Sequence, residues 1–190
     1  MTLDPTAKRR PRPPRPLKPR RLPPPLNEAS VRELALGYAA RFATTRTKLL
    51  RYLARKLKER GWDGAQPADP EALADRLAEL GYIDDAAWAA MKGRAMAARG
   101  LGHRRVTGEL AAAGVAEDDR GAAPEAGDAL ATALAFARRK RLGPFARIRS
   151  DDAAVRQKAL AAFLRAGHDL AVARAILAAA TPDEAEALAE

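Results

Sequence analysis

The sequence contains no cysteine and only two histidines, and these shortages exclude whole classes of site. Without cysteine among its 190 residues, the chain forms no disulfide and offers no thiolate to a metal ion. His103 and His168 are the remaining imidazole ligands, so we expect no metal centre and no cofactor. Because a protein without disulfides suits a reducing compartment, we expect it to be cytoplasmic.

Long apolar runs are also missing. The longest uncharged stretch near the middle runs from Ala129 to Ala137, far short of the ~20 apolar residues that a membrane span requires. Arg9 and Arg10 form a twin-arginine pair, but prolines follow them in place of an apolar signal core. The sequence therefore predicts neither a membrane span nor an export signal.

Aromatic residues make up only 5% of the chain, whereas 47 residues are alanine and supply most of the apolar fraction. Alanine has the highest helix propensity and is depleted in strands. The β-branched and aromatic residues that are typical of strands are scarce here. This composition predicts an all-α fold without a sheet.

Positive charge is concentrated at the N-terminus. The first 25 residues hold nine prolines and eight basic residues against one acid, whereas the rest has 26 basic and 23 acidic residues. Because proline removes backbone donors and no apolar period is present, we expect a disordered basic tail over residues 1–26. Two interpretations of this tail stay open: a flexible arm that binds nucleic-acid phosphates through Lys8 to Arg21, and a solubilising extension.

A short pattern recurs three times at a spacing of 53 residues. It consists of an apolar residue, a second apolar residue four positions later, and a glycine four positions after that. The three copies are Leu53, Leu57 and Gly61, then Val106, Leu110 and Gly114, then Ala159, Phe163 and Gly167. Apolar residues four apart share one helix face, and a glycine one turn on can close a helix C-terminus. The pattern predicts one helical unit copied three times, each copy packing partly against its neighbour.

Capping signals and turn residues divide the chain further. Helices are expected over residues 27–42, 47–60, 70–80, 84–99, 104–113, 128–142, 152–166 and 169–179, with a loop over 116–127. We place the first repeat at 27–66, the second at 67–116 and the third at 117–180, followed by an acidic C-terminal end at 181–190.

Asp84 and Asp85 are paired carboxylates, a residue type that acid–base catalysis uses. Adjacent residues on a helix point about 100° apart, so these two do not converge on one substrate atom. We interpret Asp84 as a helix N-cap, which accepts hydrogen bonds from exposed backbone donors. We expect no catalytic residues and no enzymatic activity.

The middle of the chain carries a series of sequence boxes in a fixed order. They are Gly81-Tyr82-Ile83-Asp84-Asp85, Trp88-Ala89, Arg99-Gly100-Leu101-Gly102, and Glu109-Leu110 before Gly114. In this order the boxes resemble the middle repeat of the RecX family, the bacterial regulators of the recombinase RecA. The resemblance extends from about Ala29 to Leu177. Two positions depart from the family pattern: Tyr52-Leu53, where Glu-Leu is frequent, and His103, where proline or a small residue is frequent.

The resemblance implies an elongated all-helical array of three tandem three-helix repeats. It implies that this array docks in the groove of the RecA filament on DNA, restrains the filament's growth or activity, and performs no catalysis. We therefore expect the RecA filament as partner, weak contact with single- or double-stranded DNA, no membrane and a monomeric chain. The alternative is a nucleic-acid-binding module of helix-turn-helix-like units that acts without RecA.

Basic residues on the expected helices are the candidates for contact with RecA or DNA, unless they form ordinary solvated faces. They are Lys48, Arg51, Arg55, Lys58, Arg99, Arg104, Arg105, Arg138, Arg139, Lys140 and Arg141. Acidic residues within a turn of the first four are few, and an anionic partner would relieve their repulsion. His103 is either a phosphate contact or an exposed turn residue.

Other residues are expected to be structural. They are Gly61, Gly81, Tyr82, Asp84, Asp85, Trp88, Gly100, Gly102, Leu110, Gly114 and Gly167. Among them, Tyr82 and Trp88 are large enough to stack on nucleic-acid bases, but we assign both to the sparse aromatic core. His168, which follows a helix-ending glycine, is interpreted as a cap or a packing residue.

Overall fold

The computed structural model describes residues 23–121, 129–148, 150 and 152–189, and these residues form helices joined by turns. The α-helices are α1 Glu28–Arg41, α2 Arg46–Arg60, α3 Pro70–Glu79, α4 Asp85–Ala98, α5 His103–Ala112, α6 Glu117–Arg120, α7 Ala129–Lys140, α8 Ala153–Arg165, α9 Leu170–Ala178 and α10 Pro182–Ala187. Extended pairing within the described ranges is limited to one isolated bridge between Leu26 and Trp62. The all-α prediction is therefore confirmed.

Two sequence expectations concern the ends and the environment of the chain. Most of the expected basic tail, residues 1–22, lies outside the described residues. In the part of the chain that the structure describes, no helix combines the length and the apolar character needed to cross a bilayer.

Local side chains start the helices where the sequence predicts. Asn27 and Ser30 form a reciprocal capping box: the Asn27 side chain accepts from Ser30 N at 2.9 Å, and Ser30 Oγ accepts from Asn27 N at 2.8 Å. Thr45 accepts from Lys48 N at 3.2 Å and begins α2. The short helix α6 lies in the stretch expected to be a loop, and its N-cap, Ala116, has no side chain that could have signalled it.

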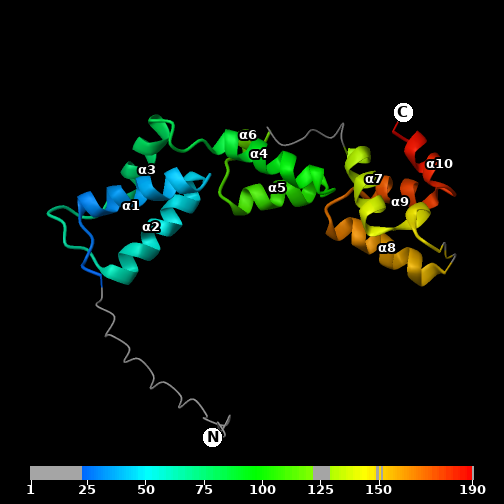
Figure 1. The fold of residues 1–190 in the computed structure, drawn as a ribbon, viewed down its shortest axis with the longest axis horizontal. Helices are drawn as coiled ribbons and strands as arrows, with labels where there is room; N and C mark the ends of the chain where they lie inside the picture. The colour runs from blue at the N-terminus through cyan, green and yellow to red at the C-terminus, as the bar shows by residue number, and fades with distance from the viewer. Residues whose placement is uncertain (1–22, 122–128, 149, 151, 190) are drawn as a thin grey trace, which may run out of the picture.

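The helices follow one another as an elongated arch (Figure 1). Three clusters of buried apolar side chains occupy the described part: one from α1, α2 and α3, one from α4, α5 and the turn after α5, and one from α7 to α10. Leu53, Leu110 and Phe163 are fully buried at corresponding places in α2, α5 and α8, which we call the second helices because each comes second in its cluster. The clusters of α4 and α5 and of α7 to α10 have few large side chains, because most of their remaining members are alanine or valine.

Helix α3 packs with the helices that precede it. Ala74 and Leu77 are buried in the first cluster, although the sequence places residues 67–116 in the second repeat. A core cluster records which helices pack together, whereas a repeat boundary records which unit recurs. The three repeats and their boundaries therefore stay predictions.

Candidate functional site

The candidate site is the concave side of the arch, along which α2, α5 and α8 follow one another (Figure 1). The N-terminus of α2 meets the C-terminus of α5, and the N-terminus of α5 meets the C-terminus of α8. A helix N-terminus has unsatisfied N–H groups and partial positive charge, whereas a C-terminus has unsatisfied carbonyls and partial negative charge. Each junction therefore joins complementary ends and aligns the three helices in one row.

Side chains of α2 make the first junction. Thr45 Oγ1 donates to the Ala113 carbonyl at 2.7 Å, and Arg51 Nη1 donates to the Ala112 carbonyl at 3.1 Å. The Thr45 side chain is fully buried between the two helices. One of the predicted contact cations, Arg51, is thus hydrogen bonded within the chain.

Lys48 also belongs to the first junction. Its Nζ lies 3.7 Å from the centroid of the Trp88 ring, a cation–π contact, and Trp88 Nε1 donates to the Ala43 carbonyl at 3.1 Å. Burial lowers the pKa of the Lys48 ammonium, and the nearby charges of Lys92 and Arg51 lower it further. Of the four predicted cations on α2, Lys48 is the one that is not exposed.

The two adjacent aspartates end on two different helices. The Asp84 carboxylate accepts from Ala87 N at 2.7 Å and caps α4, whereas Asp85 Oδ1 accepts from Arg46 N at 2.8 Å and satisfies a donor at the start of α2. Burial raises the pKa of the Asp85 carboxyl, and the hydrogen bond from the Arg46 amide opposes that rise. One residue of the pair serves its own helix, and the other serves the junction.

The Arg46 guanidinium ties α2 to α3, an interaction that the sequence analysis missed. Its Nε and Nη2 lie 2.6 Å from Asp75 and 2.6 Å from Glu71, respectively. The hydrogen bond from Arg46 lowers the pKa of Asp75. The available signal was the spacing of four between these two acids on a predicted helix, which places both on one face.

The second junction is made by the backbone. Gly102 N donates to the Ala166 carbonyl at 2.9 Å, and Arg104 N donates to the Gly167 carbonyl at 3.2 Å. A Cβ at Gly102 would overlap the Gly167 carbonyl group, and a Cβ at Gly167 would overlap the backbone of Arg105. Gly167 also has a φ of +89°, which L side chains rarely adopt. Glycine is therefore needed on both sides of this contact.

His168 is buried beside the second junction. Its Nε2 lies 3.1 Å from the Gly100 carbonyl, and its ring contacts Phe136 and Phe163 at centroid distances of 5.2 Å and 5.5 Å. Burial lowers the pKa of the imidazole, and the hydrogen bond to Gly100 opposes that fall. The side chain packs the contact between the second and third clusters.

The recurring glycines share a role in these contacts. Each lies at the end of a second helix with a positive φ, and each carbonyl accepts a hydrogen bond from a segment earlier in the chain. The Gly61 carbonyl accepts from Leu26 N at 2.9 Å, and the Gly114 carbonyl accepts from Thr47 Oγ1 at 3.4 Å. The 53-residue pattern thus marks the helix ends that dock against a preceding segment.

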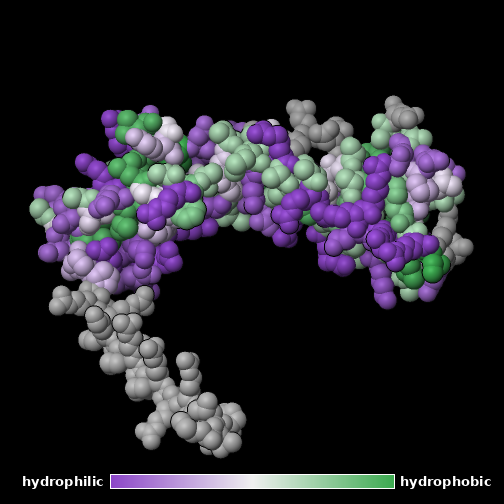
Figure 2. Space-filling model, viewed as in Figure 1, coloured by the Kyte–Doolittle hydropathy of each residue, from purple (hydrophilic) through white to green (hydrophobic). Residues whose placement is uncertain are grey.

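Exposed cations lie along the row of second helices and define what we call the basic face. Its members are Arg51, Arg55 and Lys58 on α2, Arg104 and Arg105 on α5, and Lys158 and Arg165 on α8. Lys158 and Arg165 were not among the predicted cations, and the third cation of α8, Arg156, is also exposed. Hydrophilic residues follow the lower, concave edge of the arch in Figure 2.

The other predicted cations lie outside this row. Arg99 is exposed at the end of α4, and Arg139, Lys140 and Arg141 are exposed at the end of α7. Arg138 is exposed too, but its Nε donates to Glu186 at 3.1 Å.

Arg141 has an unusual backbone conformation. Its φ is +54°, and no other non-glycine residue in the described ranges has a positive φ. The Leu142 amide donates to the Ala137 carbonyl at 3.0 Å, a pattern of helix ends in which glycine is usual. An L residue in this conformation costs roughly 1 kcal/mol.

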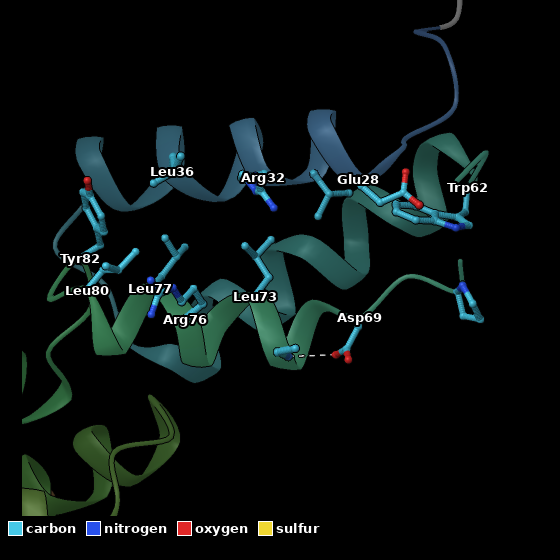
Figure 3. A pocket seen from close by; sticks show the side chains of 13 residues that line it. Glu28, Arg32, Leu36, Trp62, Asp69, Leu73, Arg76, Leu77, Leu80 and Tyr82 are labelled. Atoms are coloured by element: carbon cyan, nitrogen blue, oxygen red, sulfur yellow. Dashed lines mark hydrogen bonds between the residues drawn. The ribbon is translucent and has the colours of Figure 1, made fainter. Parts of the chain in front are cut away.

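An apolar groove lies on the other side of α1, between it and α3 (Figure 3). Leu36 points into the groove from α1, and Leu73 and Leu77 point into it from α3, around a cavity of about 590 Å³. Tyr82 is 55% exposed at one end of the groove, so its assignment to the aromatic core was wrong. The neighbouring Ile83 is buried in the first cluster and takes the core position instead.

Comparison with known proteins identifies the family, although no protein-family model matches the chain. The chain is 31% identical over 172 residues to the regulatory protein RecX of Myxococcus xanthus, covering 85% of this chain and 89% of that relative. It is 27% identical over 150 residues to the regulatory protein RecX of Agrobacterium fabrum, covering 77% and 80% of the two chains. The aligned lengths take in most of each protein, so the similarity is not confined to one helix pair. The chain therefore belongs to the RecX family of regulatory proteins.

Proposed function

We propose that this chain is a non-enzymatic regulator of DNA repair and recombination that binds the RecA filament on DNA and restrains its activity. In this proposal the arch lies along neighbouring recombinase subunits, and its helical units act as the three repeats of an array. One chain then contacts more than one subunit, so few copies affect a long filament. We also propose that it acts as a monomer in the cytoplasm.

The basic face is the observation that carries this proposal. The basic face presents seven exposed cations, two of which form ion pairs: Arg55 with Glu59 at 3.9 Å and Arg105 with Glu109 at 2.8 Å. Exposed ion pairs of this kind are weak, so they leave the positive electrostatic potential of the basic face in place. Such a field attracts an anionic surface, either DNA phosphates or the acidic lining of a recombinase groove.

Arg141 supports an additional contact at the end of α7. Its strained backbone would be relieved by glycine, and strained residues that persist are frequently functional. The residue ends the run Arg138 to Arg141, where positive charge is densest in the folded part. An anionic partner at this point accounts for an arginine in a position that favours glycine.

The test is RecA ATP hydrolysis on long single-stranded DNA, titrated with this chain while DNA stays in large excess. We expect inhibition at few copies per filament. The double variant Lys58→Glu, Arg104→Glu reverses two charges of the basic face and should abolish it. Arg94→Glu, a matched change at an exposed arginine on α4, should retain inhibition. Inhibition only when the DNA is saturated would contradict the proposal and favour a nucleic-acid binder that acts without RecA.

A further inference from the structure

An aromatic cluster lines a second cavity, which lies between α1 and α2 and has a volume of about 600 Å³. The Tyr38 and Tyr52 rings are stacked with centroids 4.3 Å apart and an interplanar angle of 15°. The Phe42 ring lies next to Tyr38, with centroids 5.3 Å apart and an interplanar angle of 50°. We call these three rings the aromatic ladder. Its last ring is open to solvent, because Phe42 is 55% exposed.

Arginine side chains surround the aromatic ladder. Arg41, Arg55 and Arg60 line the cavity, and Glu33 is the single acidic residue among the described residues of its lining. Within the described part of the chain, Arg41 makes no ion pair or side-chain hydrogen bond that would neutralise it. The Arg55 guanidinium carbon lies 5.7 Å from the centroid of the Tyr52 ring, so one of these cations sits over the ladder itself.

Aromatic rings bordered by guanidinium groups, with Arg41 free to bind an anion, suit one kind of ligand. Single-stranded nucleic acid offers unpaired bases that stack on aromatic side chains and phosphates that pair with arginine. In a duplex the base faces are already stacked, so a duplex cannot offer them to the ladder. An apolar peptide would leave the Arg41 guanidinium group without a partner, and it would suit the groove between α1 and α3 better.

We propose that this cavity binds an unpaired nucleobase of single-stranded DNA, stacked on the open face of Phe42, with the flanking phosphates on Arg41 and Arg55. The inference deepens the proposed function, because it rests on DNA being part of the partner. Arg55 belongs both to the basic face and to the cavity, so the strand passes from one to the other without a break. In this proposal only the first helical unit, through α1 and α2, contacts a base.

The backbone of Pro24 lies beside the same cavity. Arg60 Nε donates to the Pro24 carbonyl at 2.8 Å, so one of the guanidinium groups that line the cavity is held in place.

The experiment measures fluorescence anisotropy with the full chain and labelled single-stranded DNA of about 16 nucleotides, a length that suits one small binding groove. A second oligonucleotide carries abasic sites at its centre, and a third is a duplex. We expect the abasic strand to bind roughly tenfold more weakly than the complete strand, since one stacked base contributes on that scale.

Two variants locate the contact. Phe42→Ala should weaken binding of the complete strand roughly tenfold and bring it level with the abasic strand, whereas Phe42→Trp should restore the difference. Leu80→Ala is the matched control, because Leu80 is 52% exposed but lines the groove between α1 and α3. Arg41→Gln should weaken binding of complete and abasic strands equally.

Several outcomes would overturn the proposal. Equal affinity for the complete and abasic strands would show that the chain contacts no base. Tighter binding of the duplex would show that no base stacks in the cavity. An unchanged affinity in Phe42→Ala would place any base contact elsewhere. Because the assay contains no recombinase, a negative result here is distinct from a failure to inhibit RecA ATP hydrolysis.

Discussion

The two helix-end junctions join the same kinds of helix terminus by different means. At the first junction, Thr45 and Arg51 reach from α2 to the last carbonyls of α5 through their side chains. At the second, Gly102 and Arg104 donate backbone N–H groups directly to the carbonyls that end α8. Side chains separate the main chains at the first junction, whereas the main chains touch at the second.

This difference determines what each junction tolerates. A junction made by side chains depends on particular hydroxyl and cationic groups, so removal of a polar atom weakens it. A junction made by the backbone depends on the absence of side-chain atoms, so addition of one carbon disrupts it. The second junction also encloses His168, whereas the polar groups at the first include the more accessible Lys48 and Asp85.

Gly102→Ala should cause the largest loss of stability, about 3 kcal/mol, because the new Cβ would overlap the Gly167 carbonyl group. The φ of Gly102 is −73°, which alanine adopts without strain, so the loss of stability comes from the overlap with Gly167 alone. Urea unfolding at neutral pH measures it.

Gly108→Ala is the matched control on the same helix. A Cβ at Gly108 meets nothing within 4 Å, and alanine is the better helix former, so stability should rise by about 0.5 to 1 kcal/mol. Equal losses in the two variants would mean that the backbone contact does not set the second junction.

Thr45→Val should lower the free energy of unfolding by about 2 kcal/mol, because it removes both an N-cap and a buried hydrogen bond at the first junction while nearly preserving the side-chain volume. The same unfolding measurement applies. Thr107→Val is the control, because its hydroxyl bonds only to carbonyls of its own helix, and it should change stability by less than about 0.5 kcal/mol. A similar loss in both variants would contradict a role for the Thr45 bond to α5.

Helix boundaries were predictable from the sequence because their causes are local. Asn27 and Thr45 hydrogen bond to amides three residues away, and such spacings are visible in a linear chain. The recurring glycines were recognised as helix ends for the same reason. The segments they contact were not recognised, since Thr47 and Gly114 are 67 positions apart.

The candidate site was only partly predictable, because charge is visible in a sequence and its partner is not. Lys48 and Arg55 look equivalent on one face of α2, yet the first lies over the Trp88 ring and the second is exposed. Asp84 and Asp85 are chemically identical, and only the fold assigns them to different helices. The aromatic ladder had a local signal in Tyr38 and Phe42, spaced by four, but its third ring comes from another helix.

The second junction should weaken in mild acid because of His168. Burial lowers the pKa of this imidazole below its ordinary value of 6.5, so the unfolded chain takes up a proton before the folded chain does. The free energy of unfolding should therefore fall as the pH drops below about 6.5 and stay level above it. Urea midpoints across this window measure the slope.

His168→Gln removes the titrating group while keeping a side-chain donor near the Gly100 carbonyl, so the slope should flatten. His103→Gln, at an exposed position, should preserve it. At the first junction Asp85 acts with the opposite sign: its pKa is raised, so its contribution to stability grows as the pH falls through that raised pKa. A slope that survives in His168→Gln would assign the acid sensitivity to another group.

Arg141→Gly extends the comparison from the junctions to the end of α7, where an arginine occupies a conformation that glycine prefers. The substitution should raise stability by about 1 kcal/mol, because it relieves the strain of a positive φ. Thermal unfolding measures the gain. Arg139→Gly removes an equal charge from the helix itself and should instead lose about 1 kcal/mol. If both variants lose the same share of RecA inhibition while their stabilities change in opposite directions, the arginines act through their charge. Unchanged inhibition in Arg141→Gly would mean that its strained backbone has no functional reason.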